Sequence, residues 1–314
     1  MPNKILEYIK RVWLLVFIVA CLVFLVKYLY SETGRIKQPL HTSGQYLIFS
    51  GFIQATFWLA AANIWQHIVA LTAQIRLTVL GSLSQLFTMS LGKYIPGKIW
   101  GMLARGLQMR HHGITTDSAI VATFFEQFLM LQASVVLSLL LFGFISYGPL
   151  AWLAVAAAAG VVVFGQPLQT LGTVVYVKIL RYWGKDTFSE KRLVMRRKDQ
   201  TILLIKFIIL WVLSGLVLVG LYFSFFDGSY SIRLVLSLIL ANTVGITFGF
   251  FAIFAPAGIG VREGIISAIL VNQMPLTEAM LLTLLYRLWV VVIEFSGGLL
   301  SLWSARAMFQ RKTV

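Results

Sequence analysis

Long apolar runs dominate the sequence and constrain its fold more than any other feature. An α-helix needs about 20 apolar residues to cross the hydrocarbon core of a bilayer. Six segments meet that requirement as complete crossings, at residues 12–30, 45–66, 117–145, 149–178, 201–226 and 277–304. Only 12% of the 314 residues are charged, whereas a soluble domain carries about 25%. The sequence predicts an all-α polytopic membrane protein, with residues 1–314 forming one transmembrane domain.

Two further apolar segments are interrupted by proline and glycine. Residues 77–94 continue into YIPGKIWGMLARG, and residues 232–254 continue into APAGIGVREG. Each interruption is followed by a short second apolar arm, which allows two interpretations. The segment is either a kinked ordinary span or a re-entrant helical hairpin that enters and leaves the membrane on one face. The residues that form the breaks are Pro96, Gly97, Pro256, Gly258 and Gly260.

The distribution of lysine and arginine favours the hairpins. With two hairpins, the N-terminus, the basic loop 178–198 and the basic C-terminal tail all lie on the cytoplasmic face, as the positive-inside rule requires. The loop 31–44, with Arg35 and Lys37, is the one departure. No lysine or arginine occurs in three loops of the opposite face, at 146–149, 227–231 and 272–275. We therefore expect a multi-pass protein of the cytoplasmic (inner) membrane with both termini in the cytoplasm.

The hairpin interpretation also predicts an inverted repeat. The order span, span, hairpin, span occurs twice in opposite orientations, in residues 1–146 and 147–314. The helix starts at Thr116–Asp117 and Thr277–Glu278 align between the halves. Inverted repeats whose broken helices meet near the midplane are a recurrent plan among transporters.

Charged residues follow both breaks: Lys98 and Arg105 after the first, and Arg262 with Glu263 after the second. A charge at the bilayer centre costs about 2.5–3.5 kcal/mol on insertion scales, so such groups usually face a polar cavity or a partner. A helix that begins after a proline–glycine turn also presents free N–H groups to an anion. We predict an anion site, chemically suited to phosphate, between the two hairpin turns.

Three more charges lie inside the spans that follow the hairpins. Glu126 and Arg287 stand at matching positions, each about 15 Å from the start of its helix, and Glu294 lies on the same face as Arg287. Two roles remain open for them. They either form buried pairs that fix the bundle or take part in transport, with Glu126, Glu263 and Glu294 as candidates for proton coupling.

Other functions find little support. The net charge of +15 comes from basic residues that flank apolar spans, which is typical of orientation signals and contacts with anionic lipid. We therefore expect no nucleic-acid partner. The single cysteine and the absence of metal-ligand or nucleotide-binding spacings predict no metal and no cofactor.

The motifs YIPGKIWGMLARG and APAGIGVREG, followed by Arg287, resemble the flippase-like transmembrane region of the lysylphosphatidylglycerol synthases, the multiple peptide resistance factors. The resemblance implies paired re-entrant helices and movement of a charged lipid between leaflets. Relatives often have two glycines where this chain has Ala257–Gly258. The soluble synthase domain is missing, so we expect a stand-alone member that does not lysylate lipid. The resemblance carries over to Pro96, Gly97, Lys98, Arg105, Glu126, Pro256, Gly258, Gly260, Arg262, Glu263 and Arg287.

The leading hypothesis is a lipid flippase, not an enzyme. Its substrate would be an anionic-headgroup lipid: a phospholipid, a polyprenyl phosphate or a lipid-linked glycan. Lys98, Arg105 and Arg262 would neutralise the phosphate. Two alternatives remain: a membrane-embedded transferase acting on a lipid phosphate, and a non-transporting subunit of envelope-glycolipid assembly. A second copy of the chain and envelope-synthesis proteins are the protein partners considered.

Overall fold

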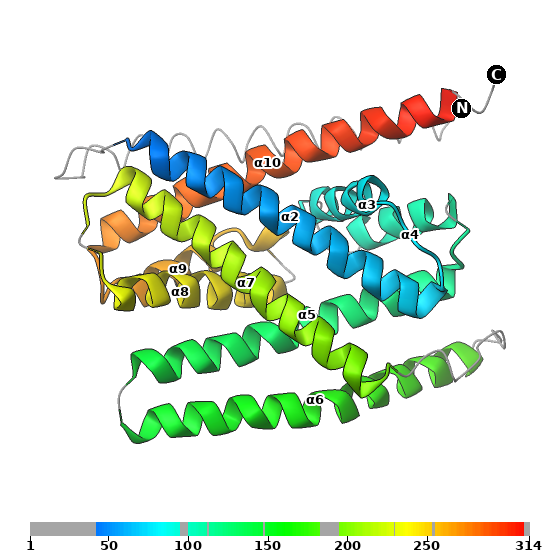
Figure 1. The fold of residues 1–314 in the computed structure, drawn as a ribbon, viewed down its shortest axis with the longest axis horizontal. Helices are drawn as coiled ribbons and strands as arrows, with labels where there is room; N and C mark the ends of the chain where they lie inside the picture. The colour runs from blue at the N-terminus through cyan, green and yellow to red at the C-terminus, as the bar shows by residue number, and fades with distance from the viewer. Residues whose placement is uncertain are drawn as a thin grey trace.

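The computed structural model describes residues 42–94, 100–111, 113–146, 148–182, 195–228, 230–252 and 255–310. Within these ranges the chain folds into nine α-helices and one 3-10 turn, without strands (Figure 1). The predicted all-α class is therefore confirmed. The elements are α2 (Gly44–Ala73), α3 (Val79–Gly92), α4 (Trp100–His111), α5 (Thr116–Ile145), α6 (Pro149–Tyr182), α7 (Arg197–Phe225), α8 (Ile232–Phe251), η2 (Pro256–Gly258), α9 (Val261–Leu270) and α10 (Leu276–Gln310).

Six of the described helices are long and apolar enough to cross a membrane, namely α2, α5, α6, α7, α8 and α10. Five of them coincide with predicted crossings, and the sixth predicted crossing, 12–30, lies outside the described residues. The difference is α8, which we predicted as one arm of a hairpin. Its 20 residues span about 30 Å, so this arm alone is as long as a crossing.

The two interrupted segments each form a pair of antiparallel helices. In the first pair, the Gln108 amide of α4 donates to the Thr88 hydroxyl of α3 at 2.8 Å. In the second pair, Gly249 of α8 packs against Gly258, and Gly245 packs against Ile266 of α9. The pairs α3–α4 and α8–α9 lie at opposite ends of the bundle (Figure 1).

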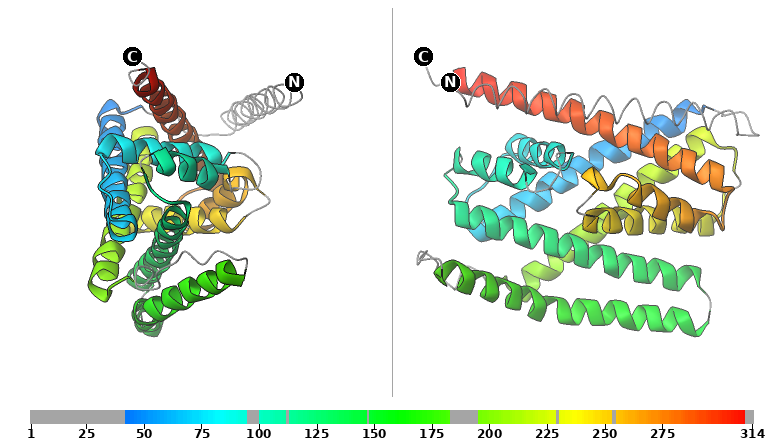
Figure 2. Two further views of the ribbon diagram at one scale, coloured as in Figure 1. Left: turned by 90° about the vertical axis from the view of Figure 1, so that its right-hand side faces the viewer. Right: turned by 180° about the vertical axis from the view of Figure 1, so that it is seen from behind.

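Each helical pair is held by a long helix that belongs to the other part of the chain. Helix α3 packs on α10, and α8 packs on α5. The approach of α10 to α3 depends on small residues, because Gly297 and Gly298 lie against Phe87 and Leu91. The rear view shows α10 running the length of the bundle above both pairs (Figure 2). The fold therefore joins its two halves at the hairpins.

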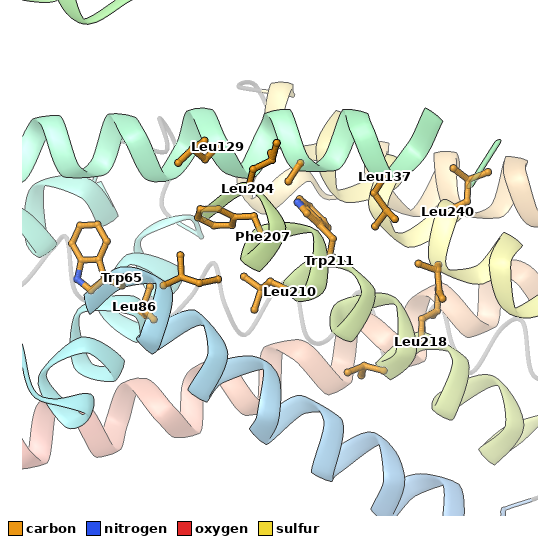
Figure 3. Close-up of a cluster of buried hydrophobic side chains, with 14 of the residues drawn as sticks. Trp65, Leu86, Leu129, Leu137, Leu204, Phe207, Leu210, Trp211, Leu218 and Leu240 are labelled. Atoms are coloured by element: carbon orange, nitrogen blue, oxygen red, sulfur yellow. The ribbon is translucent and has the colours of Figure 1, made fainter. Parts of the chain in front are cut away.

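Helix α7 lies at the centre of the apolar core (Figure 3). Its Phe207 and Leu218 are buried, and the Trp211 indole donates to the Met130 carbonyl of α5 at 2.9 Å. Helix α6 lies at the periphery against α5 and exposes large apolar side chains, including Trp152 and Val163. Such an exposed apolar face suits contact with lipid chains. Helix α7 therefore belongs to the core of the bundle and α6 to its periphery.

Candidate functional site

The C-terminal end of α3 and the second chain break lie side by side in the bundle. The backbone N–H of Ala257, in the second break, donates to the carbonyl of Lys93, the residue after α3, at 3.0 Å. This bond joins positions 164 residues apart in sequence. Non-helical backbone at membrane depth is tolerated only where protein or water satisfies its polar groups. Here Lys93, at the end of α3, supplies a polar partner for the backbone of the second break.

Charged and aromatic side chains gather around this junction, and we call them the tip cluster: Lys93, Tyr94, Arg262, Glu263, Arg287 and Glu294. Glu294 of α10 accepts from the Lys93 ammonium at 2.5 Å and from the Tyr94 hydroxyl at 2.8 Å. Arg287, also on α10, lies over the Tyr94 ring at 5.8 Å. Arg287 and Glu294 therefore face the same turn, as their seven-residue spacing predicts.

The second turn is tied to α10 as well. Arg287 donates to the Ala257 carbonyl at 3.1 Å and pairs loosely with Glu263 at 3.9 Å. The other carboxylate oxygen of Glu263 accepts from the backbone N–H of Gly260 at 2.7 Å, which caps the start of α9. Glu263 thus orients both the helix start and the arginine.

Arg262, the second residue of α9, has no carboxylate partner among the described residues. Only 7% of its surface is exposed, and its guanidinium lies over the Tyr286 ring at 4.8 Å. Among the described residues, its Nη2 nitrogen has no hydrogen-bond partner, and neither has Nη2 of the 3%-exposed Arg287. A buried charged donor left unpaired costs more than about 1–3 kcal/mol. The tip cluster therefore presents two unsatisfied guanidinium donors beside a helix N-terminus, which suits an anion.

The turn before α9 depends on left-handed backbone. Gly258 and Gly260 have φ of 72° and 84°, and a Cβ on Gly258 would also lie 2.8 Å from the Gly249 backbone. Ala257 has φ of 51°. Left-handed backbone favours glycine, so Ala257 occupies a position that glycine would adopt more easily.

A second group, the Arg105 cluster, consists of Trp65, Gln85, Arg105, Thr123 and Glu126. The Arg105 side chain is fully buried and pairs with Glu126 at 2.5 Å. The Nη2 nitrogen of Arg105, which makes this ion pair, also donates to the Thr123 hydroxyl at 3.0 Å. The Arg105 guanidinium stacks on the Trp65 ring at 3.8 Å. Trp65 in turn donates to Gln85 at 2.7 Å. In this arrangement Arg105 pairs with Glu126 between α4 and α5, while its Nε and Nη1 nitrogens are buried without a hydrogen-bond partner among the described residues.

The fold brings together four of the seven charged residues that we singled out, Arg262, Glu263, Arg287 and Glu294. Lys93 lies within electrostatic reach of both arginines. Arg105 and Glu126 form their own cluster, without a hydrogen bond or ion pair to the tip cluster among the described residues. Pro96, Gly97 and Lys98 lie outside those residues, so the predicted role of Lys98 stays a prediction.

Our sequence analysis missed Lys93, Tyr94 and Tyr286. We weighed the charges that follow each break and overlooked those that precede it, although the sequence GKYIPG puts Lys93 and Tyr94 three and two residues before Pro96. No comparable signal marks Tyr286, because tyrosine in an apolar helix is common.

One protein family, described as the lysylphosphatidylglycerol synthase TM region, matches residues 5–295 of the chain. The chain belongs to this family. Its match and the six candidate spans together identify a multi-pass membrane protein. Membership of this family indicates a function related to membrane lipid, of the kind associated with a flippase-like region. No curated protein matches the sequence.

Proposed function

We propose that this protein moves an anionic-headgroup lipid between the leaflets of the cytoplasmic membrane. The headgroup would enter between the two hairpin turns while its acyl chains stay in the bilayer. The phosphate would bind the free guanidinium nitrogens of Arg262 and Arg287 next to the start of α9. The observation that carries the proposal is the buried Arg262 without a carboxylate partner in the described part of the chain.

Chemistry supports phosphate as the recognised group. Arginine offers planar, paired N–H donors that match phosphate oxygens, and such charge-assisted bonds are about twice as strong as neutral ones. Glu263 and Glu294 already contact cations, so neither leaves a free negative charge to repel an anion. These two carboxylates remain the candidates for proton coupling, because protonating either would release its cation.

The packing supports an inverted repeat around this site. Helices α2, α3, α4 and α5 have counterparts in α7, α8, α9 and α10, and the contacts of α3 with α10 mirror those of α8 with α5. Glu126 and Arg287, which occupy matching positions, each pair with the second arm of their own hairpin. In the first half the arm carries the cation, Arg105, and in the second half it carries the anion, Glu263. We infer that the two hairpins are re-entrant from opposite faces and that the halves rock about the tip cluster.

Reconstitution tests the function. Purified protein in liposomes should accelerate leaflet exchange of fluorescent phosphatidylglycerol more than that of phosphatidylcholine, measured by dithionite quenching. Polyprenyl-phosphate and glycosylated lipids are compared in the same assay to define the headgroup. Equal exchange of the zwitterionic and anionic lipids would contradict recognition of an anion.

The same vesicles distinguish transport from catalysis. After incubation, the lipids are extracted and analysed by mass spectrometry. Unchanged lipid masses together with leaflet exchange support the flippase. A modified or cleaved lipid without exchange would instead favour the membrane-embedded transferase, and no effect of any kind would favour an assembly subunit.

A further inference from the structure

A second polar cluster lies on the outside of the bundle, where α2 and α7 pack together. It consists of Asn63 and His67 on α2 and Lys206 on α7, and we call it the Lys206 cluster. The Lys206 ammonium donates to the Asn63 side-chain oxygen at 2.8 Å and lies 3.5 Å from Nδ1 of His67. None of these residues belongs to the tip cluster or the Arg105 cluster.

The hydrogen bonds within the Lys206 cluster leave only donors free. An ammonium group has three N–H donors and no acceptor, so the atom of Asn63 that faces it must be the oxygen. The Asn63 amide NH₂ is then free to donate outward. Where the ammonium donates to Nδ1 of His67, the proton of the neutral imidazole sits on Nε2, which is also a donor. An all-donor arrangement complements a ligand that only accepts, such as phosphate.

The surroundings of the cluster are apolar and face outward. Asn63 is exposed, and its neighbours Leu59, Ile205 and Ile209 are each more than half exposed. Exposed charge in an apolar belt is costly unless it reaches a polar partner at the membrane surface. Lys206 therefore lies where a lipid headgroup, rather than bulk water, is the available partner.

The depth of the cluster places it in one leaflet. Lys206 lies about 14 Å along the axis from the first residue of α7, and Asn63 about 15 Å from the last residue of α2. The start of α2 meets the end of α7 through the bond from the Ser43 N–H to the Ser224 carbonyl at 2.9 Å. The two helices are therefore antiparallel, and the end of α2 lies on the same side as the start of α7. Arg197 and Lys198 begin α7 at this end. Basic residues at a membrane surface attract anionic lipid.

We propose that the Lys206 cluster binds the phosphodiester group of an anionic phospholipid in the leaflet that borders the start of α7. This site is separate from the tip cluster, and its existence does not depend on the proposed transport. No carboxylate within the described ranges forms an ion pair with Lys206. The lysine thus keeps a charge that a lipid phosphate can neutralise.

Native mass spectrometry of the protein released from nanodiscs tests the site. The discs contain equal amounts of phosphatidylglycerol and phosphatidylcholine, and the lipids retained per protein are counted. The wild-type chain should retain one phosphatidylglycerol. The Lys206→Gln variant should retain this lipid about tenfold more weakly. Lys206→Arg, which keeps the cation, should retain it. Arg233→Gln removes one positive charge from an exposed position at the start of α8, away from the cluster, and should leave retention unchanged.

Three results would overturn the assignment. In the first, Lys206→Gln retains phosphatidylglycerol as well as the wild type does. In the second, the wild type retains phosphatidylglycerol no better than phosphatidylcholine, which is the result expected if another segment covers the cluster. Displacement of the lipid by excess inorganic phosphate would point to a site for free anions. A failure of leaflet exchange in liposomes would affect the transport proposal and leave this measurement unchanged.

Discussion

At the scale of single residues, the same residue type plays two roles that depend on its partner. Arg105 and Arg262 are both buried, both stacked on an aromatic ring and both on the second arm of a hairpin. Arg105 is neutralised by Glu126, whereas Arg262 has no carboxylate partner in the described part of the chain. We therefore assign Arg105 to the architecture and Arg262 to ligand binding.

The Arg105 assignment predicts the stability of two variants. Glu126→Leu leaves a buried guanidinium without its counter-charge and should lower the free energy of unfolding by about 3–5 kcal/mol. The double variant Arg105→Met/Glu126→Leu removes both charges and should recover most of that loss. Thermal unfolding in detergent measures both variants.

The double variant also separates architecture from transport. If the pair only fixes the bundle, the stable double variant should keep wild-type leaflet exchange. A double variant that is stable but does not exchange lipid would show that Arg105 or Glu126 acts on the substrate.

Sequence reasoning identified which residues are unusual but not which of them meet. Arg105 and Arg262 follow similar breaks, and their spacing alone gives both the same predicted role. The difference arises from contacts between distant elements, such as Trp65 with Arg105 and Lys93 with Glu294. Helix periodicity assigns a face to each residue, but it does not determine which helix packs against that face.

At the scale of elements, hydropathy predicted the positions of the long helices better than the sequence predicted their capping residues. The predicted helix start at Thr116 is confirmed, whereas its cap is the preceding residue, Thr115, whose hydroxyl accepts from the Ser118 N–H at 3.3 Å. Two adjacent threonines offer the same hydroxyl, so sequence does not decide between them. The small residues that bring α3 close to α4 are a similar case, since glycine is common in membrane helices generally.

Close packing of α3 and α4 predicts different outcomes for two glycines of α4. A Cβ on Gly101 would clash with the Met89 carbonyl, whereas one on Gly106 meets no atom within 4 Å. Gly101→Ala should therefore lower stability by about 1–3 kcal/mol. Gly106→Ala should be neutral or stabilising, because alanine favours the helix. Equal melting temperatures for the two variants would contradict the close contact.

At the scale of the whole molecule, the proposed function depends on two helical pairs, α3–α4 and α8–α9, that lie at opposite ends of the bundle. The backbone bond between Ala257 and Lys93 joins them, and α10 contacts both. Sequence could suggest this arrangement from the basic loops and the two breaks. It could not establish the contact, which depends on how the halves pack.

The opposite orientation of the hairpins can be measured by labelling. In a Cys21→Ser background, single cysteines at Trp100 and Ile259 should react with membrane-impermeant reagents from opposite faces of sealed vesicles. Reaction of both positions from the same face only would contradict re-entry from opposite sides and the inverted repeat with it.

The most direct test of the central claim is the dependence of lipid exchange on Arg262. Arg262→Gln removes the unpaired buried charge, and Arg233→Gln removes the same charge from an exposed position at the start of α8. In liposomes, Arg262→Gln should slow exchange of fluorescent phosphatidylglycerol by about tenfold or more, while Arg233→Gln keeps the wild-type rate. An Arg262→Gln protein that folds and exchanges the anionic lipid as fast as the wild type would contradict the account.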